Sequence, residues 1–302
     1  MNTSARNEFL TARQTGIGGS DIGAILGVSP FKTAVDVYLA KTRPNPSDER
    51  SELTYWGHAV EPIIINRFSE DHGINVVKPD AIARHADHQW MVANLDGIIP
   101  GDRPGVLEIK NVSQFGTKAW GAEGTDEVPL SYVAQVAWYM AVMGYDYGVI
   151  AALFGGNDYR EFRVERDAEL EAMLINTGRD FWLNHVITGT PPEAKTASDV
   201  LRLFKRDDGS ATEADDELFD LCEQLKTAKA EGKRVEGDID LIETKIKARM
   251  GDAATLIYHG QTLATWKTQT ARRFDTKAFE AAHPALCDQF RKVSESRVFR
   301  LK

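Results

Sequence analysis

Apolar residues recur at helical spacing in several stretches of the N-terminal part of the chain. This spacing puts apolar side chains on one face of a helix. A Gly-rich turn that ends in Ser or Asp, as residues 16–21 do, is typical of a capped helix start. The pattern therefore predicts one helix starting at 20 or 21, a second after the turn at 29–30, and three more over 56–72, 129–144 and 167–186.

Short runs with a strand pattern lie between these helices, and a polar loop is predicted over 43–52. Apolar and β-branched runs bounded by turn residues predict strands over 74–78, 81–85, 91–96, 106–110, 147–154 and 159–164. The Gly/Pro/Asp turn before residue 106 predicts a hairpin with the run at 91–96. This order of elements indicates an α/β (α+β) fold with one central mixed sheet flanked by helices.

The C-terminal part follows a different pattern. Residues 191–212 are rich in Thr, Pro, Asp and Ser and are predicted to link a core, 1–190, to an extension, 213–302. Apolar residues then alternate at three and four positions from Leu218 to Ile246, which predicts a long helix or short coiled coil ending near residue 250. A helical hairpin broken at Gly232 is the alternative. A β-hairpin (256–258 and 262–267), a helix capped by Asp275 and a strand over 296–301 complete a small α/β extension.

The composition excludes several classes of protein. A chain of 302 residues with 42% hydrophobic residues can bury one large core and carry an appendage. It has no apolar run of about 18 residues, so no membrane span is expected, and its start lacks the apolar segment of a signal peptide. Two cysteines cannot build a disulfide scaffold, a four-cysteine zinc site or an iron–sulfur cluster. We therefore expect a cytoplasmic location.

The charge is unevenly distributed along the chain. The net charge of −9 argues against broad binding to nucleic acid. However, residues 1–199 carry 17 basic and 27 acidic side chains, whereas residues 200–302 carry 19 and 18. The last 37 residues carry nine basic and four acidic side chains. An acidic body with a basic end leaves nucleic acid open as a partner.

Two acids and a lysine meet in the predicted central hairpin. Alternation along a strand puts Glu108 and Lys110 on one face, and Asp96 ends the preceding strand. Two carboxylates on rigid strands suit a hard divalent ion such as Mg²⁺, to which the Ile109 carbonyl could add an oxygen. Lys110 could then hold or help deprotonate the water that attacks a phosphodiester. A solvated strand face is the ordinary alternative, although the apolar neighbours indicate a buried sheet.

Two further polar residues stand in apolar surroundings. Glu61 lies on a mostly apolar helix and could be another metal ligand, although an exposed acid near a helix start is also common. Gln135 is the lone amide in an apolar stretch and could orient water or phosphate, although the backbone usually satisfies such a residue. Neither residue by itself is strong evidence for a functional site.

Taken together in order, these residues resemble the YqaJ viral recombinase family, relatives of the phage lambda exonuclease within the PD-(D/E)xK nuclease superfamily. The superfamily often has Pro where Leu95 stands, a difference of little consequence because that proline is not a ligand. The resemblance covers about residues 10–190, and the extension also looks like that of many members. The matching motifs are Arg13…Gly18-Gly19-Ser20-Asp21, Trp56-Gly57…Glu61, Leu95-Asp96-Gly97…Glu108-Ile109-Lys110 and Tyr132…Gln135…Tyr139.

The resemblance implies a restriction-endonuclease-like core and a role for each residue. Asp96 and Glu108 would be the metal ligands, helped by Glu61. Lys110 would act on the nucleophilic water, and Gln135 would support the site. By the same resemblance, Arg13 and Ser20 would bind the terminal 5′-phosphate of DNA, which suits a bidentate guanidinium beside a Gly-rich helix start.

The implied activity is a Mg²⁺-dependent 5′→3′ exonuclease that degrades double-stranded DNA from an end and leaves a 3′ single-stranded overhang for recombination. Mn²⁺ would substitute, and Ca²⁺ would support binding but little cutting. Relatives imply a homotrimeric ring around DNA and a single-strand annealing protein as partner. Two alternatives remain open, namely an endonuclease of the same fold and a DNA-end-binding recombination scaffold.

Overall fold

The structure is a computed structural model that describes residues 11–43 and 51–302. It divides into a first unit that ends at Leu203 and a second unit, Phe204–Lys302. The polar loop predicted over 43–52 lies largely outside the described residues. The segment predicted as a linker, 191–212, contains a helix of the first unit, α7 (Ala197–Leu203), which is anchored because the Thr33 hydroxyl donates a 2.6 Å hydrogen bond to Asp199.

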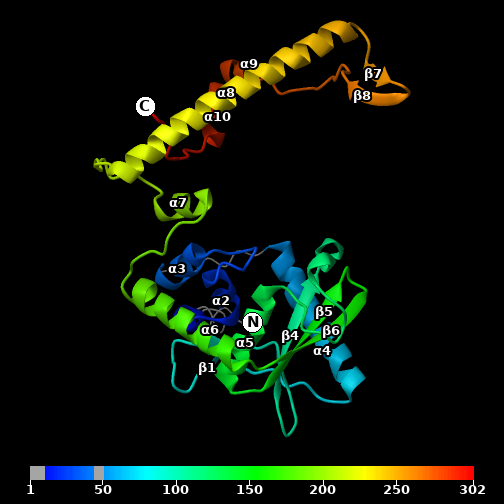
Figure 1. Cartoon of the computed structure of the whole chain (residues 1–302), viewed down its shortest axis with the longest axis vertical. Helices are drawn as coiled ribbons and strands as arrows, with labels where there is room; N and C mark the ends of the chain where they lie inside the picture. The colour runs from blue at the N-terminus through cyan, green and yellow to red at the C-terminus, as the bar shows by residue number, and fades with distance from the viewer. Residues whose placement is uncertain (1–10, 44–50) are drawn as a thin grey trace. The chain divides into compact units, whose positions relative to one another are not determined.

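A four-stranded mixed sheet forms the centre of the first unit (Figure 1). Neighbouring strands are antiparallel except β4 and β5, which are parallel. A parallel pair needs a crossover connection, and α5 supplies it between these two strands. This arrangement confirms the predicted fold class. The strands, in spatial order, are β3 (Gly97–Ile99), β4 (Gly105–Val112), β5 (Tyr147–Phe154) and β6 (Asp158–Glu165).

The helices of the first unit confirm the periodicity of the sequence. The N-terminus of α3 has a capping box, in which the side chains of Thr33 and Asp36 each accept a backbone N–H of the other residue. The last predicted helix is continuous but changes from α6 to a π-helical turn, η2 (Trp182–Ile187). The other elements are α2 (Gly19–Ile25), α3 (Ala34–Thr42), α4 (Glu52–His72), the 3₁₀ turn η1 (Gln114–Ala119), α5 (Leu130–Met143) and α6 (Ala168–Phe181).

The two faces of the sheet are covered by different helices. The face that presents Val106 packs against α5, and the face that presents Leu107 and Ile109 packs against α4. Neighbouring residues of a strand point to opposite faces. Glu108 and Lys110 therefore lie on the α5 face, as the alternation predicted.

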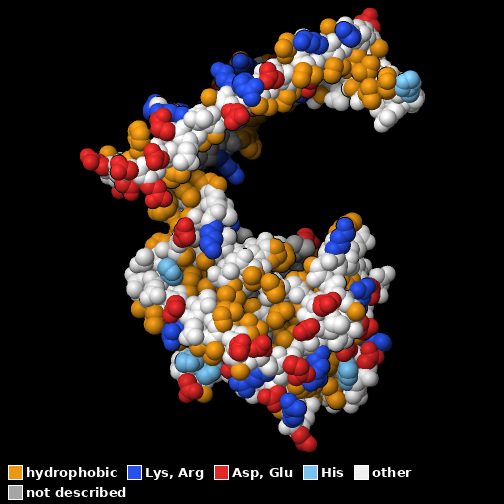
Figure 2. All heavy atoms as spheres, in the orientation of Figure 1, with side chains coloured by type: hydrophobic (Ala, Val, Ile, Leu, Met, Phe, Trp, Pro, Cys, Tyr) orange, Lys and Arg blue, Asp and Glu red, His pale blue; other side chains and the backbone are white. Residues whose placement is uncertain are grey.

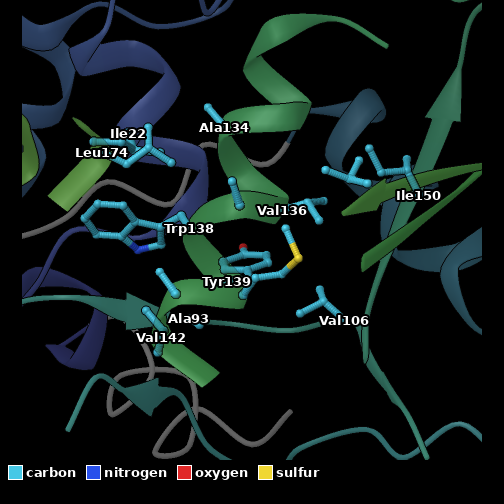
Figure 3. Close-up of a cluster of buried hydrophobic side chains, with 14 of the residues drawn as sticks. Ile22, Ala93, Val106, Ala134, Val136, Trp138, Tyr139, Val142, Ile150 and Leu174 are labelled. Atoms are coloured by element: carbon cyan, nitrogen blue, oxygen red, sulfur yellow. The ribbon is translucent and has the colours of Figure 1, made fainter. Parts of the chain in front are cut away.

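The main core surrounds α5, which is apolar on nearly all sides. Figure 3 shows Val136 directed toward Ile150 of the sheet, whereas Trp138 lies on the side of Ile22 and Leu174. A helix buried on several sides is held rigidly by packing. The polar side chains that α5 carries are consequently held in fixed positions relative to the sheet.

Two strand predictions before the central hairpin are wrong in detail. Residues 74–78 form only an isolated bridge, Val77 with Ile98, because Pro79 cannot continue the ladder. Of the predicted strand over 91–96, only β2 (Val92–Ala93) is a strand, and β3 begins after it, at Gly97. β2 pairs with β1 (Ala83–Arg84) in a separate two-stranded sheet, so the strand that forms the hairpin with β4 is β3 and not the predicted run over 91–96.

The second unit is built on one long helix, α8 (Asp216–Met250). It runs without a break through Gly232, which excludes the helical hairpin. Residues 296–301 form no strand, because no neighbouring strand offers them a ladder. No described helix, α8 included, is long and apolar enough to cross a membrane. The remaining elements are β7 (Thr255–Tyr258), β8 (Gln261–Thr265), α9 (Thr276–Ala282), which is capped by Asp275, and α10 (Pro284–Phe290).

Candidate active site

Asp96 lies in the turn that leads into β3. The prediction that Asp96 ends a strand is therefore wrong, because Asp96 directly precedes one. Its Oδ2 accepts a 2.9 Å hydrogen bond from the backbone N–H of Ile109 on β4. This bond fixes the carboxylate beside the strand that carries Glu108. Asp96 is therefore linked to the strand of Glu108 by this hydrogen bond as well as by the chain connection of the hairpin.

Glu108, Lys110 and Gln135 form one hydrogen-bonded cluster on the α5 face. The Lys110 ammonium donates to Glu108 Oε1 at 2.5 Å and to Gln135 Oε1 at 3.0 Å. The Gln135 amide donates to the same Glu108 oxygen at 2.7 Å and to the Tyr139 hydroxyl at 3.2 Å. Each side chain thus holds the others, and the structure brings these three predicted residues together.

Three positions of α5 face this cluster, at the spacing of one helix face. Besides Gln135, they are Tyr139, which accepts its hydrogen bond, and Tyr132, whose ring centroid lies 4.6 Å from Lys110 Nζ. Both tyrosines belong to the motifs that carry the family resemblance, but the resemblance assigns them no role. Their spacing from Gln135 was the signal that could have placed them at the site.

The electrostatics of the site favour an added cation. Burial and then the charge of Glu108 raise the pKa of Asp96 well above its usual value. Burial also raises the pKa of Glu108, although Lys110 lowers it in part. The pKa of Lys110 is itself raised, because the attraction of Glu108 and Asp96 exceeds the effect of burial. One ammonium therefore faces two buried carboxylates that are incompletely compensated.

The donor set fits a hard divalent ion. Glu108 Oε2 is buried and accepts no hydrogen bond, which is costly for a carboxylate oxygen unless a cation binds there. Carboxylates on rigid strands are the oxygen ligands that Mg²⁺ prefers. Among the residues described, no three acidic, His or Cys side chains already form a metal-binding group. Asp96 and Glu108 are thus two candidate ligands, to which the Ile109 carbonyl, on the same strand as Glu108, could add a third oxygen.

After burial, the charge of Glu61 contributes to the raised pKa of both Asp96 and Glu108. Glu61 is nearly buried on α4, and its carboxylate forms an ion pair with Lys78 and lies 3.6 Å from His58 Nδ1. The sequence pattern does not place Lys78 at the site, because Lys78 ends a stretch, 74–78, that is predicted to be an ordinary strand. Glu61 is therefore electrostatically coupled to the candidate metal site but is paired with Lys78.

A pocket of about 150 Å³ joins the cluster to the N-terminal motif. Its lining includes Arg13, Ser20, Lys41, Asp96, Gln135 and Tyr139. The volume is about ten times the 10–15 Å³ that one water molecule needs. The two predicted subsites, for metal and for a terminal phosphate, consequently open into one space.

A buried ion pair supports the side of this pocket that is predicted to bind phosphate. Lys41 Nζ lies 2.7 Å from Asp21 Oδ2, with both side chains almost fully buried, and donates to the Arg13 carbonyl at 2.7 Å. The other end of the turn is held because Gly18 N–H donates to Asp21. Burial opposes ionisation, but Lys41, Arg13 and Lys32 together lower the pKa of Asp21 to about 2. No local pattern in the sequence predicts this pair.

Gly19 allows α2 to approach α5 closely. A β-carbon there would lie 2.5 Å from Tyr139 Cε1 and 3.0 Å from Gln135 Cγ. We expect Gly19→Ala to lower the free energy of unfolding by about 1–3 kcal/mol, because overpacking forces these side chains to move. Thermal unfolding measures the effect, with Gly57→Ala as the matched control because its β-carbon meets nothing within 4 Å. Equal stability of the two variants would contradict the close contact.

Comparisons with known proteins agree with the motifs. A family model for the YqaJ-like viral recombinase domain matches residues 8–146. A protein named YqaJ, uncharacterized, from Bacillus subtilis (strain 168) is 31% identical over 306 residues, which cover 99% of this chain and 94% of that protein. The match therefore includes the second unit.

Solved structures resemble the first unit in fold. LHK-Exo in complex with dAMP superposes with a TM-score of 0.50 at 18% identity, over 61% of this chain and 94% of that chain. The alkaline exonuclease LHK-Exo from Laribacter hongkongensis gives a TM-score of 0.48 at 19% identity, with the same coverage. At this identity the likeness concerns the fold.

Proposed function

Because the chain belongs to the family of YqaJ-like viral recombinase domains, we propose that it is a divalent-metal-dependent exonuclease, which degrades double-stranded DNA in the 5′→3′ direction and leaves a 3′ single-stranded overhang. The observation that carries the proposal is the shared pocket. It has Asp96 and Gln135 on one side, beside the unpartnered carboxylate oxygen of Glu108, and Arg13 and Ser20 on the other.

The metal is Mg²⁺ in this proposal, and Mn²⁺ would substitute. When bound, the ion would polarise the scissile phosphate and lower the pKa of water. Asp96, Glu108 and the Ile109 carbonyl would hold it, and Glu61 would join them if it leaves Lys78. Hydrolysis forms a bond between the water oxygen and phosphorus and breaks the P–O3′ bond, and the 3′ oxygen takes up a proton.

Lys110 acts as a hydrogen-bond donor in this scheme. Its raised pKa keeps it an ammonium, so it would orient the attacking water or the phosphate oxygens and stabilise the charge that develops there. Gln135 keeps the ammonium directed at the site through its 3.0 Å contact. Of the two roles that the sequence left open for Lys110, holding the water suits this environment better than deprotonating it.

Arg13 and Ser20 would bind the terminal 5′-phosphate, and Lys41 supports Arg13 through its backbone carbonyl. Cleavage of the P–O3′ bond leaves a new 5′-phosphate on the shortened strand. The product of one cycle is thus a suitable ligand for the same subsite in the next. An enzyme that cuts internally has no need for such a subsite, which favours the exonuclease over an endonuclease of the same fold.

Replacing Arg13 tests the phosphate subsite directly. We expect Arg13→Ala to remove the preference for 5′-phosphorylated over 5′-hydroxyl ends, because a bidentate, charge-assisted contact is lost. Loss of one such contact corresponds to roughly a tenfold to hundredfold change in preference. The measurement compares initial rates on duplexes with either end, and Arg103→Ala, at an exposed arginine paired with Asp146, serves as the control. An unchanged preference would exclude Arg13 from the subsite.

The decisive experiment uses linear duplex DNA labelled at either the 5′ or the 3′ end, beside a closed circular duplex, with Mg²⁺ or EDTA. The exonuclease predicts Mg²⁺-dependent release of the 5′ label as mononucleotide, with the circle intact. Cutting of the circle would indicate the endonuclease. Binding to ends without any cutting would indicate the recombination scaffold.

We further propose that the protein assembles as a homotrimeric ring around DNA and works beside a single-strand annealing protein. A ring would reconcile the net charge of −9 with DNA binding, because cations can line the channel while acids face outward. Light scattering of the full chain gives its molecular mass. A monomer at working concentration would exclude the ring and leave the nuclease proposal intact.

A further inference from the structure

The last 37 residues of the chain combine aromatic and basic side chains in a regular way. They contain five aromatic residues, of which four stand directly beside Lys or Arg in the sequence. These are Trp266 beside Lys267, Phe274 after Arg272-Arg273, Phe290 before Arg291-Lys292, and Phe299 before Arg300. The exception is Phe279, whose neighbours are Ala278 and Glu280.

The four aromatic residues beside cations differ from Phe279 in solvent exposure. The four aromatic side chains next to cations are between 49% and 78% exposed. Phe279 is half-buried and packs on Phe274 and His283, with ring centroids 4.9 and 5.1 Å apart. Phe279 thus supports the fold of this segment, whereas the four others offer most of their surface to solvent. Burial in a core does not explain them.

Most cations of the segment are available. Among its nine basic side chains, Arg291 pairs with Glu280 and Asp288, and Arg297 donates to a backbone carbonyl. In the part of the chain that the structure describes, the side chains of the other seven make no ion pair or hydrogen bond. They are Lys267, Arg272, Arg273, Lys277, Lys292, Arg300 and Lys302. A segment with nine basic and four acidic residues can therefore bind a polyanion.

We propose that residues 266–302 bind single-stranded DNA. Free cations contact phosphates, and exposed aromatic rings between them stack on bases, which every sequence offers. In a duplex the bases are already stacked on one another. Its phosphates would therefore contact the cations, but no base would stack on the aromatic rings. The interleaving of the two residue types therefore selects unpaired strands. That the natural ligand is the 3′ overhang rests on the proposed function, but binding itself does not.

A competing ligand for the cations lies in the same unit. Residues 213–223, at the start of α8, carry six acidic and no basic side chains, and Figure 2 shows acidic side chains gathered at that end of the helix. An acidic protein surface of this kind would attract the basic residues of 266–302. It would not require aromatic rings beside them. Substitutions at the aromatic positions therefore distinguish the two ligands.

The test is fluorescence anisotropy of a labelled oligothymidylate with the full chain in EDTA, where no cutting occurs. We expect Phe290→Ala and Phe299→Ala each to weaken binding roughly 5- to 150-fold, the range for loss of one stacking residue. Phe219→Ala is the matched control, because Phe219 is 60% exposed but stands beside Asp220. It should bind as the unaltered chain does. All three sites are exposed, so each variant should keep its circular dichroism spectrum.

Two further variants identify the interaction. Phe299→Tyr keeps an aromatic ring and should bind as the unaltered chain does, whereas Phe299→Leu keeps apolar bulk without stacking and should bind as weakly as Phe299→Ala. Replacing Arg272 and Arg273 by Gln should reduce the slope of log K against log salt by about 1.4, since each phosphate contact on a single strand contributes about 0.7.

Binding by Phe290→Ala and Phe299→Ala at the unaltered affinity would overturn the proposal, as would full binding by Phe299→Leu, which would indicate an apolar docking surface. A duplex bound equally well, with only the arginine variant weakened, would also overturn it. Hydrolysis of blunt duplexes is assayed separately. Ring-dependent binding without any nuclease activity would refute the proposed function and leave this inference standing.

Discussion

Asp96→Asn, Glu108→Gln and Lys110→Met are each expected to reduce the rate of DNA hydrolysis by at least about 10³-fold. Asp96 and Glu108 are the carboxylates that would hold the metal, and Lys110 is the ammonium nearest to them. Removing a metal ligand or a positioned donor removes stabilisation that acts mainly on the transition state. The measurement is the single-turnover rate on 5′-phosphorylated duplex at saturating Mg²⁺.

Of these variants, the two amide substitutions, Asp96→Asn and Glu108→Gln, should fold and bind DNA normally, whereas Lys110→Met leaves buried Glu108 without its cation and is assayed at a temperature where it remains folded. Asn at 96 can still accept the Ile109 N–H, and amides relieve the repulsion between two buried carboxylates. The melting temperature of Asp96→Asn in EDTA should therefore equal or exceed that of the unaltered chain. Binding measured in Ca²⁺, whose looser coordination positions water poorly, should be unchanged. Normal turnover in any of the three variants would place the active site elsewhere.

Lys41→Met is expected to have the largest effect on stability. It leaves the Asp21 carboxylate buried without its 2.7 Å partner. Breaking a buried ion pair on one side costs about 3–5 kcal/mol, which corresponds to a fall of about 6–20 °C in melting temperature for a unit of this size. The double variant Asp21→Asn with Lys41→Met removes the uncompensated charge and should regain most of the loss.

The stability of the unaltered chain and that of Lys41→Met should change with pH in opposite directions. In the unaltered chain the pKa of Asp21 is lowered from 3.8 to about 2. Ionised Asp21 therefore contributes its full stabilisation above about pH 4, and this contribution is lost as the pH falls toward 2, whereas burial lowers the pKa of its partner Lys41 and offsets part of it. In Lys41→Met, burial dominates and raises the pKa of Asp21, so stability falls as the pH rises above about 4. Urea unfolding at several pH values measures both slopes.

If Lys41→Met lowered the free energy of unfolding by less than about 1 kcal/mol, and its stability changed with pH in the same direction as in the unaltered chain, Arg13 and Lys32 alone would compensate the charge of Asp21. Activity gives a second reading, because Lys41 also holds the Arg13 carbonyl. At a temperature where Lys41→Met remains folded, its preference for 5′-phosphorylated ends should weaken. Arg202→Met is a suitable comparison, since it breaks a partly exposed ion pair with Asp36 outside the pocket.

Local patterns were sufficient for most helices and for the strand that carries the site. The apolar period of α5 and α8 and the alternation of Glu108 and Lys110 depend on neighbouring residues only, so one sequence contains them. Tyr139 belonged to the same helix face as Gln135 and was recoverable from spacing. The capping box of α3 is local too.

Features that depend on distant partners were not predictable in this way. Residues 74–78 and 296–301 have strand-like composition, but a strand needs a partner edge, and the first finds a single bridge and the second none. The ion pair of Asp21 with Lys41 and that of Glu61 with Lys78 join separate elements. Arg13 entered the candidate site through resemblance alone, because nothing near it in the sequence indicates a pocket.

The continuity of α8 sets a length scale for the second unit. At 1.5 Å per residue, its 35 residues span about 52 Å, which equals about 15 base pairs of duplex at 3.4 Å each. The two ends of this helix therefore cannot touch the same base pair, and a fragment shorter than about 15 base pairs cannot reach both. The helix has two intrinsically weak positions, Gly232 and Gly237, since a glycine there lowers helix stability by about 1 kcal/mol relative to alanine.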